Sequence, residues 1–260
     1  MRLKILVDTN IFIAASIRAV ISEHKIDVKH LFFDVSTALL SLIQKHIDKR
    51  VGIVTARIET EAHNVLERAV LDELKKVGGD YTVLSAVLGI CGDRLRRFLQ
   101  SMIREPVEQE KVDKWFEKVS RFFVLQYERL TLVDRSAIKS LAREKALVSV
   151  SKRFRSIGEQ IREDEVIDSY YQLTRLRYRR VKTNDMWILA EAAYLKDHYQ
   201  REGPVKFYIA SNDQHLSPVL DDEDQPISTK ITDEIRNEFG IECDWAHRVA
   251  DQIGKCLAES

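Results

Sequence analysis

The hydrophobic and polar positions of this chain follow two patterns, which alternate at both of its ends. Short runs of branched apolar residues are typical of buried strands, and apolar residues spaced by three and four are typical of amphipathic helices. The short runs predict strands at 3–7, 51–55 and 205–210. The helical spacing predicts helices at about 31–48, 55–77, 184–200, 231–239 and 245–257, and a helical pattern also begins at Asn10. This alternation predicts an α/β fold, with helices on both faces of a parallel sheet.

Residues 80–179 have a different character. Their apolar positions keep helical spacing, Arg, Lys and Glu are dense between them, and no strand pattern stands out. Pro106, the only proline in this range, is expected to mark a turn before a helix. We therefore expect a core domain formed by 1–79 and 180–260, interrupted by a mostly helical insertion at 80–179.

Composition narrows the class of protein only slightly. The 260 residues include 41 Lys and Arg and 41 Asp and Glu, so the net charge neither favours nor excludes nucleic acid as a partner. The three cysteines have no zinc-binding spacing and form no disulfide framework. No signal peptide and no apolar run of about 18 residues is evident, so a cytoplasmic protein without membrane contact is expected.

Four acidic residues lie at the ends of predicted strands or on the helices beside them. Asp8 follows the first strand, and Asp213 follows the strand at 205–210. Asp185 stands at the start of a predicted helix, and Glu61 lies on the helix after the second strand. Parallel sheets bind ligands at the carboxyl ends of their strands, so Asp8 and Asp213 are expected to converge.

Such a set of carboxylates predicts a divalent metal site. Carboxylates that gather in a pocket repel one another and need a cation to coexist. Oxygen ligands select hard ions such as Mg²⁺ or Mn²⁺. An ion of this kind activates water and stabilises the charge that develops on a phosphate during hydrolysis.

Each acid also has a structural alternative. Asp185 suits a helix start through the helix dipole, and Glu61 has the features of a solvated surface residue. Asp213 suits an Asx turn at the end of a strand. Asp8 is the strongest candidate, because a charge directly after an apolar strand is costly unless it has a use. Asp233 and Asp244 are spare acids. His63 and His215 flank predicted acids, and hydrogen-bonded structural roles are expected for both.

Four segments around these acids resemble PIN-domain nucleases. Residues 7–11 (VDTNI) resemble the opening of the family, and residues 61–66 (EAHNVL) resemble its helical glutamate segment. Residues 185–193 (DMWILAEAA) look like the third acid with its Ala-rich helix, and residues 209–213 (IASND) are similar to the strand that carries the fourth. The resemblance covers about 1–75 and 180–260. The range between has no counterpart in compact members of the family.

The resemblance implies a Rossmann-like, PIN-like parallel sheet and metal-dependent cleavage of RNA, less often DNA. It implies that Asp8, Glu61, Asp185 and Asp213 ligate Mg²⁺ or Mn²⁺ or orient the attacking water. Thr9 and Asn10 would support Asp8 by hydrogen bonds, and Ser211 or Asn212 would do the same near Asp213. Many family members are toxins of toxin–antitoxin pairs, so an antitoxin or another protein is a possible partner, as is a second copy of the chain. The insertion would shape substrate choice, pair protomers or bind such a partner.

Residues 170–182 form the most basic aromatic stretch of the chain and lead directly to Asp185. Cations neutralise phosphates, and aromatic rings stack on unpaired bases. The candidates for nucleic-acid binding are Arg175, Arg177, Tyr178, Arg179, Arg180 and Lys182. The alternative is a solvated helix face whose tyrosines pack on the core.

The leading interpretation is a metal-dependent endonuclease that acts on RNA. A catalytically inactive PIN-like scaffold, which binds RNA or protein through its helical insertion, is the first alternative. A phosphatase that uses Asp8 as nucleophile is the second, but it would favour another acid at position 10, where this chain has Asn10.

Overall fold

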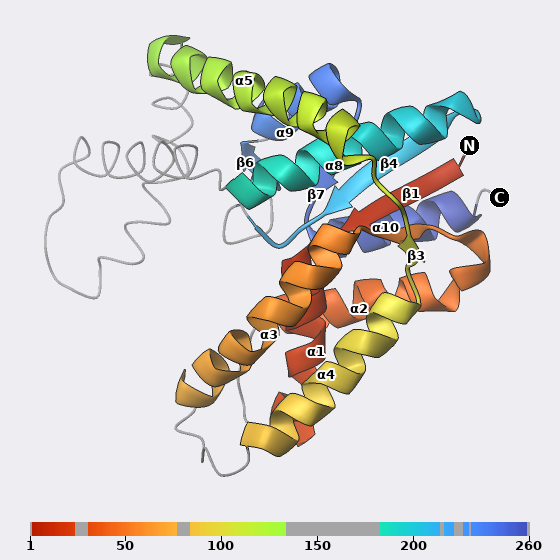
Figure 1. Ribbon diagram of the computed structural model, residues 1–260, viewed down its shortest axis with the longest axis vertical. Coiled ribbons are helices and arrows are strands. Elements are labelled where there is room, and N and C mark those ends of the chain that lie inside the picture. The colour runs from red at the N-terminus through yellow and green to blue at the C-terminus, as the bar shows by residue number, and fades with distance from the viewer. Residues whose placement is uncertain are drawn as a thin grey trace, which may run out of the picture.

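The centre of the protein is a five-stranded parallel sheet in the order β3-β2-β1-β4-β7 (Figure 1). The computed structural model describes residues 2–23, 31–76, 84–133, 183–213, 216–220, 226–228 and 230–258. The strands of the sheet are β1 (Arg2–Val7), β2 (Gly52–Val54), β3 (Ile103–Arg104), β4 (Val205–Ala210) and β7 (Glu242–Asp244). A separate antiparallel pair consists of β5 (Val219–Leu220) and β6 (Pro226–Ser228). The predicted α/β class with a Rossmann-like parallel sheet is confirmed.

Helices cover both faces of this sheet (Figure 1). The helices are α1 (Thr9–Glu23), α2 (Leu31–Lys45), α3 (Ala56–Lys76), α4 (Leu84–Gln100), α5 (Gln109–Val133), α8 (Thr183–Arg201), α9 (Lys230–Phe239) and α10 (Ala246–Ala258), with a 3₁₀ turn, η1, at Ile47–Lys49. On one face α1 packs against α2, α3 and α4, and α10 packs against α2. On the other face α5 packs against α8. Among the helices that the structure describes, none has the length and apolar character to cross a lipid bilayer.

The two central strands pair over their whole length. β1 and β4 are parallel, with the register running from Arg2 opposite Val205 to Val7 opposite Ala210. Apolar side chains on both strands make this seam the centre of the core, and Ile5, Leu6 and Phe207 are almost completely buried. The next residues, Asp8 and Ser211, therefore emerge side by side at the carboxyl edge of the sheet. The strand order turns back at this seam, which is where sheets of this kind place ligands.

Residues 80–179 include one short strand, although no strand pattern stands out there in the sequence. Ile103 and Arg104 form β3, which pairs parallel with β2 at the edge of the sheet. α4 packs against α1 and α3, so the described start of this range belongs to the layers around the sheet. Pro106, where a turn was expected, lies in the irregular segment 105–108, and α5 follows it. Most of the remaining range, from 134 to 182, lies outside the described residues, and a division into core domain and insertion stays a prediction.

Candidate metal centre

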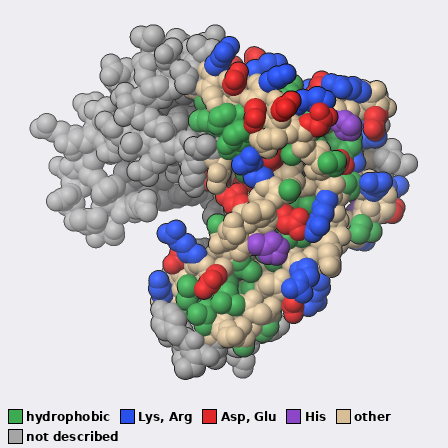
Figure 2. All heavy atoms as spheres, in the orientation of Figure 1, with side chains coloured by type: hydrophobic (Ala, Val, Ile, Leu, Met, Phe, Trp, Pro, Cys, Tyr) green, Lys and Arg blue, Asp and Glu red, His purple; other side chains and the backbone are tan. Residues whose placement is uncertain are grey.

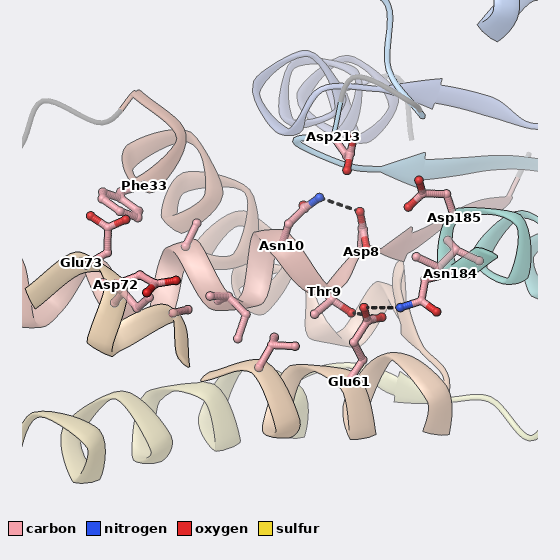
Figure 3. Close-up of a pocket in the computed structure, with 16 residues that line it drawn as sticks. Asp8, Thr9, Asn10, Phe33, Glu61, Asp72, Glu73, Asn184, Asp185 and Asp213 are labelled. Carbon is pink, nitrogen blue, oxygen red and sulfur yellow. Dashed lines mark hydrogen bonds between the residues drawn. The ribbon is translucent and has the colours of Figure 1, made fainter. Parts of the chain in front are cut away.

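The four predicted acids line one cavity at the carboxyl edge of the sheet (Figure 3). Asp8 comes from the end of β1, and Asp213 from the segment after β4. Asp185 lies in the first turn of α8, and Glu61 lies on α3. The cavity has a volume of about 420 Å³. Segments far apart in the sequence thus bring their carboxyl groups to a common space, and the strand pattern predicted this for Asp8 and Asp213.

Asp8 is held rigidly by its neighbours. Its side chain is only 4% exposed, and its Oδ2 accepts hydrogen bonds from Asn10 Nδ2 at 2.7 Å and from Ser211 Oγ at 2.6 Å. The Ser211 hydroxyl also accepts bonds from Asn10 Nδ2 at 3.1 Å and from the backbone N–H of Asp213 at 2.9 Å. Because those donors fill its acceptor sites, its single proton points to Asp8. Asn10 and Ser211 thus fix one oxygen of this carboxyl.

Glu61 is tied to both sides of the cavity. Its Oε2 accepts a hydrogen bond from Thr9 Oγ1 at 3.1 Å, and its Oε1 accepts one from Asn184 Nδ2 at 2.9 Å (Figure 3). The Thr9 side chain, expected to support Asp8, therefore supports Glu61, although its backbone N–H does bond to the carboxylate of Asp8. Asn184 lines the cavity as well, and it was not among the predicted site residues. Its position directly before Asp185 was the available signal.

The electrostatic environment of Asp8 favours a neutral carboxyl in the absence of a cation. Burial raises the pKa of Asp8 from 3.8 to about 7. The hydrogen bond from Ser211 lowers this pKa, whereas the negative charges of Asp185 and Glu61 raise it further. Asp185 itself is only 5% exposed. Two buried carboxylates that repel each other are costly, and a divalent cation between them would remove that cost.

The donor set fits a hard cation in chemistry, but the side chains are not gathered around one point. Carboxylate oxygens are the ligands that Mg²⁺ and Mn²⁺ prefer. Within the part of the chain that the structure describes, no three His, Cys, Asp or Glu side chains stand close enough together to hold one ion. A bound ion would therefore have to draw the carboxyl groups of Asp8, Asp185 and Asp213 closer to one another.

Comparisons with protein-family models, with curated proteins and with solved structures found no match to this chain. The topology of the sheet and the geometry of the cavity are therefore the observations on which a function has to be proposed.

Other predicted site residues have different roles or lie elsewhere. The backbone N–H of Asn212 donates to Asn10 Oδ1 at 3.1 Å, while its side chain bonds to Ser36 Oγ at 2.7 Å. Asn212 thus ties the segment after β4 to α1 and α2. The spare acid Asp244 pairs with Arg248 at 3.0 Å, near the start of α10. Neither Asp233 nor Asp244 lines the cavity.

The candidate nucleic-acid stretch lies outside the described residues. This holds for all six of its members, Arg175, Arg177, Tyr178, Arg179, Arg180 and Lys182, and also for His215. The described face over α5 and α8 mixes both signs of charge (Figure 2). Ion pairs such as Lys111 with Glu108 and Arg201 with Asp197, each at 2.8 Å, account for part of that mixture. That face offers no track of a single charge for a phosphate backbone.

A buried glutamate joins the two helices that carry Glu61 and Asp185. Glu191 on α8 is 1% exposed, and it accepts hydrogen bonds from Thr55 Oγ1 at 2.6 Å and from Arg57 Nε at 3.0 Å. The Arg57 guanidinium also lies 4.4 Å from the centre of the Trp187 ring. These contacts hold the start of α3 against α8. This role was not predicted from the sequence, although a glutamate within the apolar 188–193 segment was a signal for it.

Proposed function

We propose that this chain is a Mg²⁺- or Mn²⁺-dependent endonuclease of the PIN type, which hydrolyses phosphodiester bonds in RNA and less readily in DNA. The environment of Asp8 is the observation that supports this proposal most. A buried carboxyl with a pKa of about 7 stands beside Asp185 and Glu61 at the point where the strand order turns back. Such an arrangement destabilises the metal-free fold, and a divalent ion would turn it into a favourable one.

In this proposal the side chains of the cavity have different roles. Asp8, Asp185 and Asp213 would hold the ion, which supplies an activated water and neutralises charge on the phosphate. Asn10 and Ser211 hold Asp8 so that its remaining oxygen is presented in a fixed direction. Glu61, fixed through both oxygens by Thr9 and Asn184, would orient the water that attacks. Polar groups that are already in position before the reaction stabilise the charge of the transition state most strongly.

A catalytically inactive scaffold is the second candidate function. It is favoured by one observation, that the described carboxyl groups do not converge as a ligand set. In that case the acids would take no part in hydrolysis, and RNA or protein would bind through the helical insertion expected at 80–179.

Cleavage of RNA by matched variants separates the two candidates. Wild type, Asp8→Asn and the control Glu67→Gln, which changes an exposed carboxyl on α3 outside the cavity, are incubated with RNA in Mn²⁺ or in EDTA. A nuclease predicts cleavage by wild type and control, loss in the Asp8 variant and loss in EDTA. Equal cleavage by all three proteins indicates contamination and removes the nuclease proposal. RNA binding without cleavage by wild type supports the scaffold.

A further inference from the structure

The described lining of the acidic cavity contains no cation for the strand that carries the scissile phosphate. None of the described residues that line it is Lys or Arg. A metal ion offsets charge at the phosphate that is cut, but the phosphates on either side of it remain negative beside Asp8, Asp185 and Glu61. Proteins hold such phosphates with Lys and Arg side chains. The proposed function therefore requires a cation close to the acids and outside the cavity itself.

Arg57 lies one helical turn from Glu61. Both residues are on α3, four positions apart, which places them on the same side of the helix and about 6 Å apart along it. Each also reaches across to α8, Glu61 to Asn184 and Arg57 to Glu191. Because α3 begins directly after β2, the neighbour of β1, Arg57 stands at the same edge of the sheet as Asp8. A strand whose scissile phosphate lies at the acids therefore brings its next phosphate within reach of this long side chain.

The contacts of Arg57 fix its guanidinium and leave two of its nitrogens available. Nε donates to Glu191 Oε1 at 3.0 Å. The guanidinium carbon lies 4.4 Å from the centre of the Trp187 ring, which is itself stacked on Phe116 at 3.9 Å. The side chain is 33% exposed, and among the described residues neither terminal nitrogen has a hydrogen-bond partner. A planar fork of N–H groups that is already held in place suits a phosphate, because little freedom is lost when the bonds form.

The ion pair between Arg57 and Glu191 is more than the contact between α3 and α8 requires. Glu191 is 1% exposed, and the burial of a carboxylate is costly even when it is paired. Apolar side chains of similar size would join the two helices without that cost. The charge that this pair keeps at the surface, beside the acids, therefore points to a use for Arg57 in binding.

We propose that Arg57 binds the phosphate next to the one that is cut. The inference rests on the proposed nuclease function and names a residue that binds its substrate. The contact is with the backbone of the strand, so it holds the substrate in register and is the same for every base sequence.

The salt dependence of cleavage tests this inference. In Mn²⁺ and a series of KCl concentrations, kcat and KM for oligouridine are measured for wild type, Arg57→Gln and the control Arg236→Gln. Arg236 also pairs with an acid, Asp233, at 2.9 Å, but it lies beside Glu242 at the amino end of β7, the opposite edge of the sheet. Loss of one charge-assisted contact should raise KM of Arg57→Gln about tenfold at low salt, with kcat unchanged. The slope of log KM against log salt should fall by about 0.7, the value for one phosphate of a single strand.

A neutral linkage in the RNA identifies the phosphate. One phosphate of the oligouridine is replaced by a methylphosphonate, which has no charge, and the bonds that are cut are mapped by gel electrophoresis. Wild type and Arg236→Gln should cut the bond on one side of this linkage about tenfold less than the same bond in unmodified RNA. Arg57→Gln should show no such loss. A variant that only loosened the contact between α3 and α8 would lower cleavage at every bond and retain both the salt slope and the loss at the neutral linkage.

A second variant protects the test against misfolding. Arg57→Gln leaves the buried Glu191 without its charged partner, whereas Arg57→Gln combined with Glu191→Gln removes both charges. The double variant, compared with Glu191→Gln alone, should show the same fall in salt slope. Thermal unfolding in Mn²⁺ confirms that each protein is folded.

The outcomes separate this inference from the proposed function. Asp8-dependent cleavage with the same salt slope and the same loss at the neutral linkage in wild type and Arg57→Gln overturns the role of Arg57 and leaves the nuclease standing. If no Asp8-dependent cleavage occurs, binding of fluorescein-labelled oligouridine to both proteins is compared by fluorescence anisotropy over the same salt range. Weaker binding by Arg57→Gln, with a slope smaller by about 0.7, supports the phosphate contact although the nuclease proposal fails. Equal affinities and slopes, or no binding to wild type, overturn the inference.

Discussion

Replacing Asp8 with Asn is expected to stabilise the metal-free protein, and to do so more strongly as the pH rises. Burial raises the pKa of Asp8 from 3.8 to about 7, so between these values the folded chain keeps a proton that the unfolded chain releases. For such a group the free energy of unfolding is highest below the unfolded pKa and falls as the pH rises through the folded pKa. The amide in the variant does not ionise, so only the wild type loses this stability.

The size of the effect follows from the difference between the two pKa values. One pKa unit corresponds to 1.36 kcal/mol, so a rise from 3.8 to about 7 corresponds to about 4 kcal/mol. The difference in free energy of unfolding between Asp8→Asn and wild type should grow by about 1.4 kcal/mol per pH unit from about pH 4 to about pH 7, and then stay constant. Altered hydrogen bonds to Asn10 and Ser211 shift this difference at every pH and leave its slope unchanged.

Urea unfolding in EDTA at several pH values between about pH 5 and about pH 8 measures this slope. Glu67→Gln, which removes an exposed carboxyl, serves as the control and should differ from wild type by the same amount throughout. If the free energy of unfolding varied with pH in the same way for wild type and Asp8→Asn, the reasoning would be refuted. They would mean that Asp8 ionises in the fold as easily as in the unfolded chain, and the principal support for a cation in this cavity would be lost.

Three further predictions concern the metal, the glutamate between helices and the start of β2. Mn²⁺ at a hundred times its Kd should raise the free energy of unfolding of wild type by about 2.7 kcal/mol and leave Asp8→Asn unchanged; identical shifts would place the ion elsewhere. Glu191→Gln should cost about 2 kcal/mol in urea unfolding, because the part-exposed Arg57 loses a buried partner; no cost would mean that this pair does not stabilise the contact between α3 and α8. Gly52→Ala should cost about 1–3 kcal/mol in the same assay, because a Cβ there would lie 2.6 Å from Ile43 and from Met102; a neutral result would mean that both side chains move aside freely.

The sequence predicted the central seam and the main helices because their patterns are long. β1 and β4 are runs of apolar residues, and the rule that parallel strands share a carboxyl edge was enough to bring Asp8 and Asp213 together. β3 has two residues and β7 has three, so neither is long enough to show a period. The pairing that makes Ile103 and Arg104 a strand comes from β2, which lies about fifty positions away.

Contacts between distant segments explain the site residues that were missed. Asn184 and Glu191 lie on α8, and their partners Glu61, Thr55 and Arg57 lie on or beside α3. A periodic pattern reports which face of a helix is buried, and it does not report which polar group across the interface completes a hydrogen bond. The hydroxyl of Thr9 bonds to Glu61 on α3 for the same reason, since the placement of α3 decides which carboxylate it reaches.

The hydrogen bond between Ser211 and Asp8 joins residues 203 positions apart in the chain, with consequences during protein synthesis. A ribosome has to deliver nearly the whole polypeptide before the first strand can acquire its neighbour, because pairing of such separation comes late in folding. Nascent and prematurely terminated chains would therefore lack the acidic cavity altogether. Under the proposed nuclease function, the chain would stay inert beside the messenger RNA that encodes it until translation is almost finished.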